Sequence, residues 1–461
     1  MQKRSLRNLK KTALRLNLNK FLQSTETSSA RTRDFCLFIR HNMEKIKKKQ
    51  HRKSTMLIWL CWLVYMCSYL GKVNYSANIT QIESFFNVTH AEAGLVSTFF
   101  FFAYGAGQIV NGVFCSKYNT KYAVFFALLV SALCNLLMAI VPVSGFWALK
   151  FLWLVNGAAL SVLWPSLIGL LAKTLKKEDM ARASVTMGTT VACGTLVIYG
   201  LSSVYATWNL FRLAFYTAGI VVPIIGVVWL CAFKRLTTAD EADGSLDVSE
   251  PLPTQTKGAQ AFPKTLLPTV CILAFFAVAT NLVAEGLTTW VPAILKETYD
   301  FPDSLSILLT LLLPLVSVFG NLFANILHKK IPDFVYQTAL FFLIIGVLLG
   351  AVVGLLPISA ILTLILFACV RFLAGSSNST ITSIFPLLIK GKVNSGMIAG
   401  VLNGFCYVGS VIASYGLGVI ADHLGWNWVF YVLIGACVLV VAIASVYALC
   451  KAGKGKGKTN G

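Results

Sequence analysis

Charged side chains are scarce in this sequence. Only 12% of the 461 residues are Asp, Glu, Lys or Arg, whereas 57% are hydrophobic. A soluble globular domain carries about 25% charged residues, so this composition excludes a soluble protein. Twelve apolar stretches are each long enough, at about 1.5 Å per residue, to cross roughly 30 Å of hydrocarbon. The sequence therefore predicts an all-α membrane protein.

The predicted spans are separated by polar connections. They lie at 56–80, 94–115, 122–142, 146–172, 183–206, 211–233, 266–291, 304–327, 334–356, 358–389, 394–420 and 426–450. Segments 1–55 and 451–461 are predicted to be basic tails. The segment 234–265 is rich in Thr, Ser, Pro and acidic residues, which predicts a linker. It divides the chain into two six-helix bundles, 56–233 and 266–450.

Several kinds of site are missing. The twelve cysteines are scattered without a CxxC pair, which supports neither a disulfide framework nor a metal site. No nucleophile with a base, and no phosphate-binding loop, is recognisable, so we expect neither an enzyme nor a cofactor. No histidine lies inside a predicted span, which argues against a histidine relay through the membrane. The five histidines are His41, His51, His90, His328 and His423.

The net charge of +21 does not indicate a nucleic-acid-binding protein, because the cations alternate along the chain. Nearly all of the 39 Lys and Arg lie in the two tails or in every second connection; Arg212 and Lys296 are the exceptions outside the spans. This is the positive-inside pattern of a membrane protein. It predicts a cell-membrane protein, which we expect to be bacterial and monomeric, with both termini in the cytoplasm.

The two halves echo each other. The basic turn KTLKKEDMARAS at 173–184 is matched by KGKVNSG at 390–396, and WNLFRLAFY at 208–216 by WNWVFY at 426–431. Both shifts are about 217 residues. Such a parallel repeat is typical of one large class of secondary transporters, in which two pseudo-symmetric bundles enclose a midplane site.

Ionisable side chains inside the predicted spans are rare and costly, by at least about 2.5 kcal/mol each on insertion scales. Lys72 lies past the middle of the first span, within MCSYLGKVNYSAN. It either snorkels towards the headgroups or faces a polar cavity. Its predicted helical face includes Tyr69 and Ser76, and Tyr75 adds to the polarity of this end, which favours the cavity.

Glu285 is the only carboxylate inside a predicted span, and it matches Lys72 at nearly the repeat offset. Arg371, in ILFACVRFLAGSSNST, is its candidate partner. The pair either holds two helices together or takes part in coupling through a proton. The polar run GSSNSTITS at 375–383 is either part of the site or a helix-packing surface. Lys150, beside Trp147, is predicted to be an interfacial anchor.

Several motifs identify a resemblance. YLGKVNYSANITQIESFFNVTHAEAGLVSTFFFFAYGAGQIVNG, LVNGAALSVLWPS, TTWVP and SGMIAGVLNGFCYVGSVIASYGLGVIADHLGWNWVF resemble the major facilitator superfamily. The NG and WP pairs of the second motif are Asn156, Gly157, Trp164 and Pro165. The resemblance is strongest to the organophosphate:phosphate antiporter family, and helix 1 is also similar to that of the anion:cation symporters.

The resemblance implies roles for individual residues. Lys72 stands at the place of the family's phosphate-gripping arginine, and Tyr69, Tyr104 and Trp164 at aromatic cavity positions. The departures are equally informative: the helix 7 arginine corresponds to Ala284. A family histidine falls near Thr190, a family lysine near Gln108, and the aspartate of the loop after helix 2 is Ser116. Fewer cations favour a monoanion or zwitterion over a dianionic phosphate ester.

We therefore predict a secondary active transporter that moves a small polar anion, such as a phosphate ester or sugar acid, by alternating access. A transporter-like membrane sensor is the alternative. Antiport and proton symport both remain open. The predicted substrate-binding residues are Lys72, Tyr69, Tyr75, Tyr104, Gln108, Trp164, Asn281, Glu285 and Arg371.

Overall fold

The computed structural model describes residues 51–114, 118–175, 177–236, 266–389 and 395–456. Contacts divide the chain into two units, 1–57 and 58–461. In the first unit, the described residues 51–57 are helical. All further description concerns the second unit. Most of the two predicted tails and of the predicted linker lies outside the described residues.

Twelve helices within the described ranges are long and apolar enough to cross a membrane, and no strand forms in those ranges. The predicted fold class, an all-α membrane protein with twelve membrane helices, is confirmed. The candidate spans are His51–Gly71, His90–Gly112, Thr120–Ile140, Val143–Thr174, Val185–Thr207, Arg212–Leu236, Leu267–Tyr299, Asp303–His328, Phe334–Leu355, Ala360–Ile384, Ile398–Leu424 and Trp426–Lys451.

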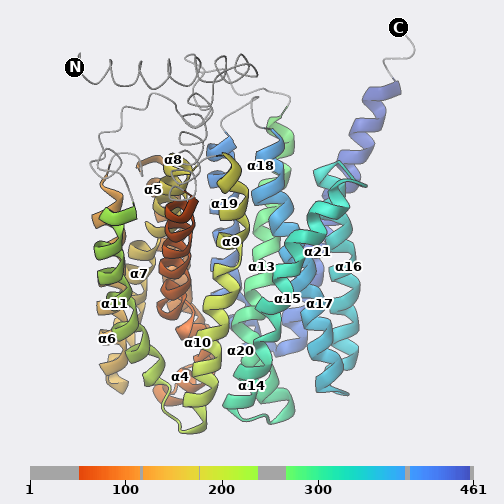
Figure 1. Ribbon diagram of the computed structural model, residues 1–461. Coiled ribbons are helices and arrows are strands. Elements are labelled where there is room, and N and C mark those ends of the chain that lie inside the picture. Colours follow the sequence, from red (N-terminus) through yellow and green to blue (C-terminus); the bar gives the residue numbers. More distant parts are fainter. Residues whose placement is uncertain (1–50, 115–117, 176, 237–265, 390–394, 457–461) are drawn as a thin grey trace, which may run out of the picture. The chain divides into compact units, whose positions relative to one another are not determined.

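Individual elements subdivide these spans (Figure 1). The first half contains η1 (Tyr69–Gly71), α3 (Asn74–Ala77), α4 (Ile79–Phe86), α5 (His90–Phe114), α6 (Thr120–Ile140), η2 (Val143–Gly145), α7 (Phe146–Leu160), α8 (Leu163–Thr174), α9 (Lys177–Gly188), α10 (Thr190–Thr207) and α11 (Arg212–Leu236). The second half contains α13 (Leu267–Tyr299), α14 (Asp303–Thr310), α15 (Leu312–His328), α16 (Phe334–Leu355), α17 (Ala360–Ser379), η3 (Thr380–Ile384), α18 (Phe385–Leu388), α19 (Ser395–Val411), η4 (Ile412–Gly416), α20 (Leu417–Leu424) and α21 (Trp426–Lys456).

Two boundaries correct the sequence analysis. Helix α13 continues to Tyr299 and ends where Asp300 adopts a left-handed conformation with φ of 53°, so Glu297 belongs to its last turn and not to a connection. Likewise, His90 is the first residue of α5 and not a connection residue. The predicted spans were too short because charged residues at helix ends look like connections in the sequence.

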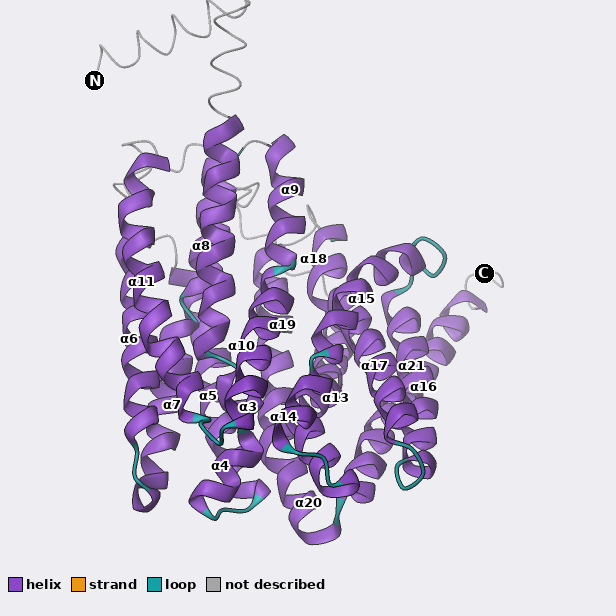
Figure 2. Ribbon diagram, turned by 60° about the horizontal axis from the view of Figure 1, so that its bottom comes forward, coloured by secondary structure: helices purple, strands orange, loops and turns teal. Residues whose placement is uncertain are grey.

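Two helix pairs supply most of the contacts between the two halves. Helix α5 packs along α19, η4 and α20, and α10 packs on α14 and α15. In the numbering of the spans these are helices 2 with 11 and 5 with 8, which a shift of six helices exchanges. The pairing therefore has the pseudo-symmetry that the repeat predicts. Helices α4, α14 and α20 lie at the same end of the bundle (Figures 1 and 2), which we call the α4 face.

Close approach near the α4 face depends on a glycine and on π-helical turns. A Cβ added at Gly94 of α5 would overlap the carbonyl oxygen of Ser414 in η4. The π-helical segment η4 also leaves carbonyls free for other helices. The Thr98 hydroxyl donates to the Val411 carbonyl at 3.2 Å. These contacts fix α5 of the first half against the eleventh span.

Large apolar side chains cover the outside of the bundle. Trp147, Ile361 and Leu449, for example, each expose more than 70% of their surface. A surface of this kind is stable only against lipid, since water would make exposed apolar patches of this extent aggregate. The chain is a multi-pass membrane protein.

Candidate functional site

The first membrane helix breaks at Lys72. The Gly71 carbonyl accepts hydrogen bonds from the side-chain amides of Asn156 at 2.7 Å and Asn135 at 3.3 Å. Hydrogen bonds from side chains of other helices occupy this carbonyl at the point where the helix is interrupted. The segment η1 ends at Gly71, and α3 begins at Asn74. A continuous helix over 56–80 was predicted. The break replaces that helix, while the Lys72 ammonium still lies beside Tyr69, as the predicted shared face implies.

The Lys72 ammonium lies among tyrosine rings. Its Nζ is 4.0 Å from the ring centroid of Tyr104, 4.9 Å from that of Tyr69 and 5.9 Å from that of Tyr407. A cation within about 6 Å of an aromatic centroid is attracted by the ring quadrupole. We call Lys72 with these three tyrosines the Lys72 cage. Tyr407 comes from α19, so the cage includes both halves of the chain.

Hydrogen bonds link the cage to its surroundings. The Tyr104 hydroxyl accepts from Gln108 Nε2 at 2.9 Å and lies 3.4 Å from the Tyr65 hydroxyl. Gln108 Oε1 accepts in turn from Asn403 Nδ2 of α19 at 3.1 Å. The ring of Trp164 packs on that of Tyr65 with 4.8 Å between centroids. The structure thus brings the predicted residues Tyr104, Gln108 and Trp164 close to Lys72.

Glu285 and Arg371 were predicted to form an ion pair, and the structure separates them. Within the described ranges, no carboxylate lies within 4.0 Å of the Arg371 guanidinium or of the Lys72 ammonium. Arg371 donates from an Nη atom to Ser317 Oγ at 3.1 Å, and its buried Nε has no hydrogen-bond partner in the described part of the chain. The charges of Arg371 and Lys72 still act on Glu285 over a longer distance.

Two predicted residues connect helices. Tyr75 is fully buried, its hydroxyl donates to the Ala93 carbonyl at 2.9 Å, and its ring packs on Trp153. The structure therefore gives Tyr75 a packing role instead of the predicted place in the substrate site. Asn281 of α13 donates from Nδ2 to Ser410 Oγ of α19 at 3.1 Å, which joins two helices of the second half.

The polar run at 375–383 belongs mainly to a helix-packing surface. A Cβ added at Gly375 would lie 2.7 Å from Ser317 Oγ, so α17 and α15 approach closely here. Ser377 is fully buried and shares a hydrogen bond of 2.8 Å with Thr280 of α13. Small residues at helix contacts are the usual means of close packing in membranes. Asn378 and Thr382 are partly exposed, and Ser383 at the end of the run is exposed.

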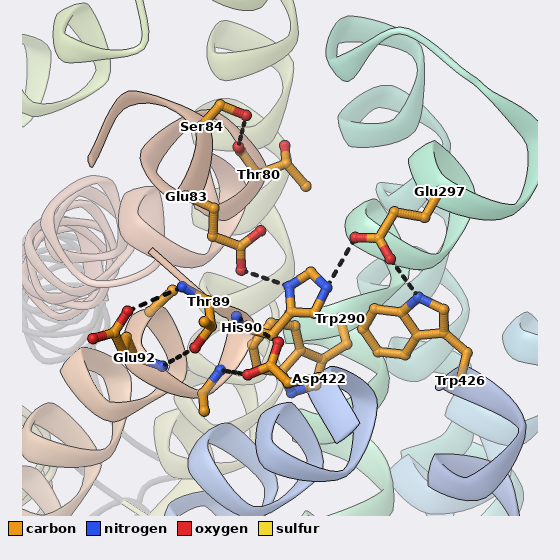
Figure 3. Close-up of polar contacts among 12 residues, drawn as sticks. Thr80, Glu83, Ser84, Thr89, His90, Glu92, Trp290, Glu297, Asp422 and Trp426 are labelled. Carbon is orange, nitrogen blue, oxygen red and sulfur yellow. Dashed lines mark hydrogen bonds and ion pairs between the residues drawn. The ribbon is translucent and has the colours of Figure 1, made fainter. Parts of the chain in front are cut away.

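A second group of charges lies at the α4 face (Figure 3). The His90 ring bridges two carboxylates, with Nδ1 3.0 Å from Glu83 Oε1 and Nε2 2.9 Å from Glu297 Oε1. Trp426 Nε1 donates to the other oxygen of Glu297 at 2.8 Å. Burial raises the pKa of the Glu83 carboxyl, while its hydrogen bond to His90 acts in the opposite direction. We call Glu83, His90 and Glu297 the His90 triad.

Further polar contacts close this face. The Asp422 carboxylate of α20 accepts from the backbone N–H groups of His90 at 2.9 Å and Ala91 at 2.7 Å, at the positive end of the α5 dipole. The Thr80 hydroxyl donates to Asp303 at 2.7 Å, and Lys296 pairs with the same carboxylate at 3.0 Å. Each of these contacts with Asp422 and Asp303 joins or supports the junction between the two halves.

Sequence reasoning missed Tyr65, Tyr407 and the His90 triad. Tyr65 lies four residues before Tyr69 and seven before Lys72, which is the spacing of one helical face and was the available signal. Tyr407 is contributed by the second half, so only the tertiary fold brings it to Lys72. The three residues of the triad looked like solvated residues of connections because the helix ends were not recognised.

Comparisons with known proteins agree with this architecture. A family model described as Major Facilitator Superfamily matches residues 61–414. Sugar phosphate exchanger 3 of Gallus gallus is 23% identical over 385 residues, which cover 74% of this chain and 76% of that protein. A probable hexose phosphate transport protein of Chlamydia trachomatis is 21% identical, with 87% and 92% covered.

Two further similarities concern a sensor and a solved structure. The membrane sensor protein UhpC of Escherichia coli is 21% identical over 388 residues, covering 81% of this chain and 87% of the sensor. The crystal structure of a bacterial homologue of the human lysosomal transporter Spinster superposes with a TM-score of 0.70. It is 12% identical and covers 85% of this chain and 96% of the other. That similarity concerns the fold alone.

Proposed function

Because the chain belongs to the major facilitator superfamily, we propose that it is an exchanger of sugar phosphates or closely related organic phosphate esters. The chain is a secondary active transporter of a small organic solute. We propose alternating access of its two halves about the Lys72 cage, in the cytoplasmic membrane and as a monomer. No enzymatic step is part of the proposal.

The observation that carries the proposal is the Lys72 cage. Lys72 is partly accessible, and the groups around its ammonium are aromatic faces and not carboxylates. Aromatic faces hold the ammonium in place while leaving its charge uncompensated. An arriving anion gains the full charge-assisted interaction, since it need not displace a protein carboxylate. The aromatic rings also suit the apolar face of a sugar.

Arg371 is proposed as the second anion-binding group. Its guanidinium has a hydrogen bond to one serine hydroxyl, and its Nε has no partner among the described residues. A buried N–H group without a partner is costly, so a ligand oxygen that reaches it contributes strongly to binding. A phosphate oxygen matches the fork geometry of arginine.

The charge balance of the site constrains the bound species. Lys72 and Arg371 supply two positive charges, and Glu285 supplies a negative one that acts on both. A phosphate monoester is a monoanion below its second pKa of about 6 and a dianion above it. We propose that the site takes the monoanion, or the dianion together with a proton. Exchange is then faster at pH 5.5 than at pH 7.5.

Orientation follows from the distribution of lysine and arginine. At the α4 face, Arg212 begins α11 and Lys296 lies in the last turn of α13, whereas segments 116–122, 173–182 and 234–265, at and after the ends of α5, α8 and α11, together contain ten lysines and arginines. The positive-inside rule then places the α4 face outside the cell and both termini in the cytoplasm. On this assignment the described conformation is closed towards the outside, because the contacts of the α4 face join the halves there.

Exchange in proteoliposomes tests the proposal. Vesicles loaded with inorganic phosphate are given labelled glucose 6-phosphate, and gluconate and glutamate serve as other anions. We expect exchange of the sugar phosphate, a loss of at least about 100-fold in Lys72→Ala, and little change in Lys150→Ala. Lys150 is the matched control because its Nζ lies over Phe146 at the start of α7, away from the cage. Unchanged exchange in Lys72→Ala would overturn the assignment.

A membrane sensor is the second candidate, supported by the similarity to UhpC. A sensor of this kind would bind the same sugar phosphates through the Lys72 cage without moving them at a useful rate. Binding measured by a rise in melting temperature, together with no exchange in the vesicles, would favour the sensor.

A further inference from the structure

The hydrogen-bond geometry of the His90 triad fixes its proton content. Both ring nitrogens of His90 lie within hydrogen-bond distance of a carboxylate oxygen, at 3.0 and 2.9 Å. Ionised carboxylates only accept, and a neutral imidazole donates from one nitrogen only. Two bonds therefore require either an imidazolium or a protonated carboxyl of Glu83 or Glu297. In each case the triad holds one proton more than a neutral histidine with two carboxylates.

The three members come from different halves of the molecule. Glu83 on α4 and His90 on α5 belong to the first half, whereas Glu297 on α13 belongs to the second. The indole rings of Trp290 and Trp426, also from the second half, lie with their centroids 5.5 and 5.2 Å from that of His90. When the halves separate at the α4 face, Glu297 and both rings leave His90, while Glu83 stays with it.

The surroundings of His90 are predominantly acidic. Charged or titratable groups from each neighbouring element are Glu83 of α4, Glu92 of α5, Lys296 and Glu297 of α13, Asp303 of α14, and Asp422 and His423 of α20. Lys296 is engaged by Asp303 and so does not offset Glu297 directly. Closure brings Glu297 and Asp422 to His90 and thereby adds negative charge around it. No group of three His, Cys, Asp or Glu in the described ranges is arranged as a metal site.

We propose that the His90 triad is a proton-binding site that is completed when the α4 face closes. The closed state binds one proton that the separated state releases, so acid on this side of the membrane favours closure. This inference concerns the gate and does not depend on the identity of the substrate in the Lys72 cage.

The direction and size of the effect follow from linkage. With the halves apart, His90 keeps Glu83 but loses Glu297, so it releases its proton at a lower pH than in the closed state. While both states are protonated, their ratio is constant. The open state starts to lose its proton at a pH no lower than the ordinary histidine value of about 6.5, and the closed-to-open ratio then falls by up to about tenfold per pH unit, which corresponds to one proton.

The proton exchanges with the compartment at the α4 face. The His90 and Glu297 side chains are 16% and 43% exposed even in this closed arrangement. His90 of the triad is the first residue of α5 (Figure 3), whereas Tyr104 of the Lys72 cage lies in the middle of the same helix. The protonation of the triad therefore follows the pH of the compartment at the α4 face, and the triad does not carry a proton through the membrane.

A distance measurement tests the proposal without any substrate. Spin or fluorescent labels are attached at Ser144, in η2 between α6 and α7, and Ile358, between α16 and α17. The full chain, with its twelve cysteines replaced by serine or alanine, is placed in lipid nanodiscs. We expect the population with the short distance to fall from pH 6.5 to pH 9. His90→Gln should give a ratio independent of pH.

Matched variants make the result specific. His423→Gln alters an exposed histidine near the triad and should titrate as the unaltered chain does. Glu297→Gln keeps His90 and should lose most of the pH dependence, which covers the case in which His90→Gln fails to fold. The proposal is overturned if the closed-to-open ratio of the unaltered chain does not change with pH. It is also overturned if His90→Gln and Glu297→Gln keep the pH dependence of the unaltered chain. If the unaltered chain shows the expected pH dependence of the closed-to-open ratio but does not exchange sugar phosphates, only the proposed function is contradicted.

Discussion

The molecule contains two groups of embedded charges that differ in how they are satisfied. In the His90 triad, the nitrogens and the carboxylate oxygens are in direct contact, at 2.9 and 3.0 Å. Around the Lys72 cage, neither Lys72 nor Arg371 has a carboxylate within 4.0 Å in the described part of the chain. The charges of the His90 triad therefore pair with each other. The charges of Lys72 and Arg371 are available to a bound anion.

This difference separates gating from binding. Contacts between the halves stabilise one conformation and must break in each transport cycle, so they are direct but few. A substrate site that paired its own cations would have to break those pairs before each binding event, which costs affinity. The Lys72 cage avoids this cost by using aromatic faces. The α4 face therefore stabilises one conformation, and the Lys72 cage provides affinity for the substrate.

The largest expected effect breaks the α4 face alone. Gly94→Ala places a Cβ against the carbonyl oxygen of Ser414, so α5 and η4 cannot approach and the closed state is lost. We expect exchange in proteoliposomes to fall at least about 100-fold, while thermal-shift binding to the Lys72 cage is retained. Gly200→Ala in α10 is the control, because no atom of the described residues lies within 4 Å of a Cβ added there. Equal losses in both variants would contradict the steric argument.

A double-mutant cycle measures the coupling between Glu285 and Arg371. Arg371→Gln should weaken binding of glucose 6-phosphate at least about tenfold, since a charged donor to phosphate is lost. Glu285→Gln should tighten it severalfold at pH 7.5, because a repelling charge is removed. Without a contact ion pair between them, the coupling energy should stay below about 1 kcal/mol. Calorimetric titration of the four proteins measures it, and a coupling of several kcal/mol would restore the predicted ion pair.

The smallest expected effect concerns Tyr75. Tyr75→Phe removes its hydrogen bond to the Ala93 carbonyl and leaves the ring packing on Trp153. The free energy of unfolding should fall by about 1 kcal/mol, the typical contribution of one such bond. Thermal unfolding in detergent detects this change. The KM of exchange should not move, and a raised KM with unchanged stability would return Tyr75 to the substrate site.

The fold was largely predictable from the sequence, because each span must be about 20 apolar residues long whatever its neighbours are. The twelve spans follow from that requirement. The break at Lys72 was not predictable, since it depends on Asn135 and Asn156 of other helices, which hydrogen-bond to Gly71. Local propensity carries no information about such a tertiary contact.

The candidate site was predictable in part for the same reason. Lys72 and Arg371 stand out in the sequence because charge in an apolar span is expensive. Tyr407 carries no such signal, since aromatic residues are common in membrane helices. The predicted ion pair between Glu285 and Arg371 was the least secure inference from the sequence. Proximity of opposite charges on two helices depends on side-chain geometry within a few ångströms, which neither composition nor repeat offset determines.

The π-helical segment η4 has a consequence for rotation. An i→i+5 turn holds about one residue more than an α-helical turn, and one residue in a helix corresponds to about 100° of rotation and 1.5 Å of rise. The segment Ile412–Gly416 therefore sets the angular phase of α20 relative to α19. Return of η4 to α-helical geometry would turn Asp422 away from the start of α5. A shift of a single hydrogen-bond register thus acts as a rotary adjustment of the eleventh span.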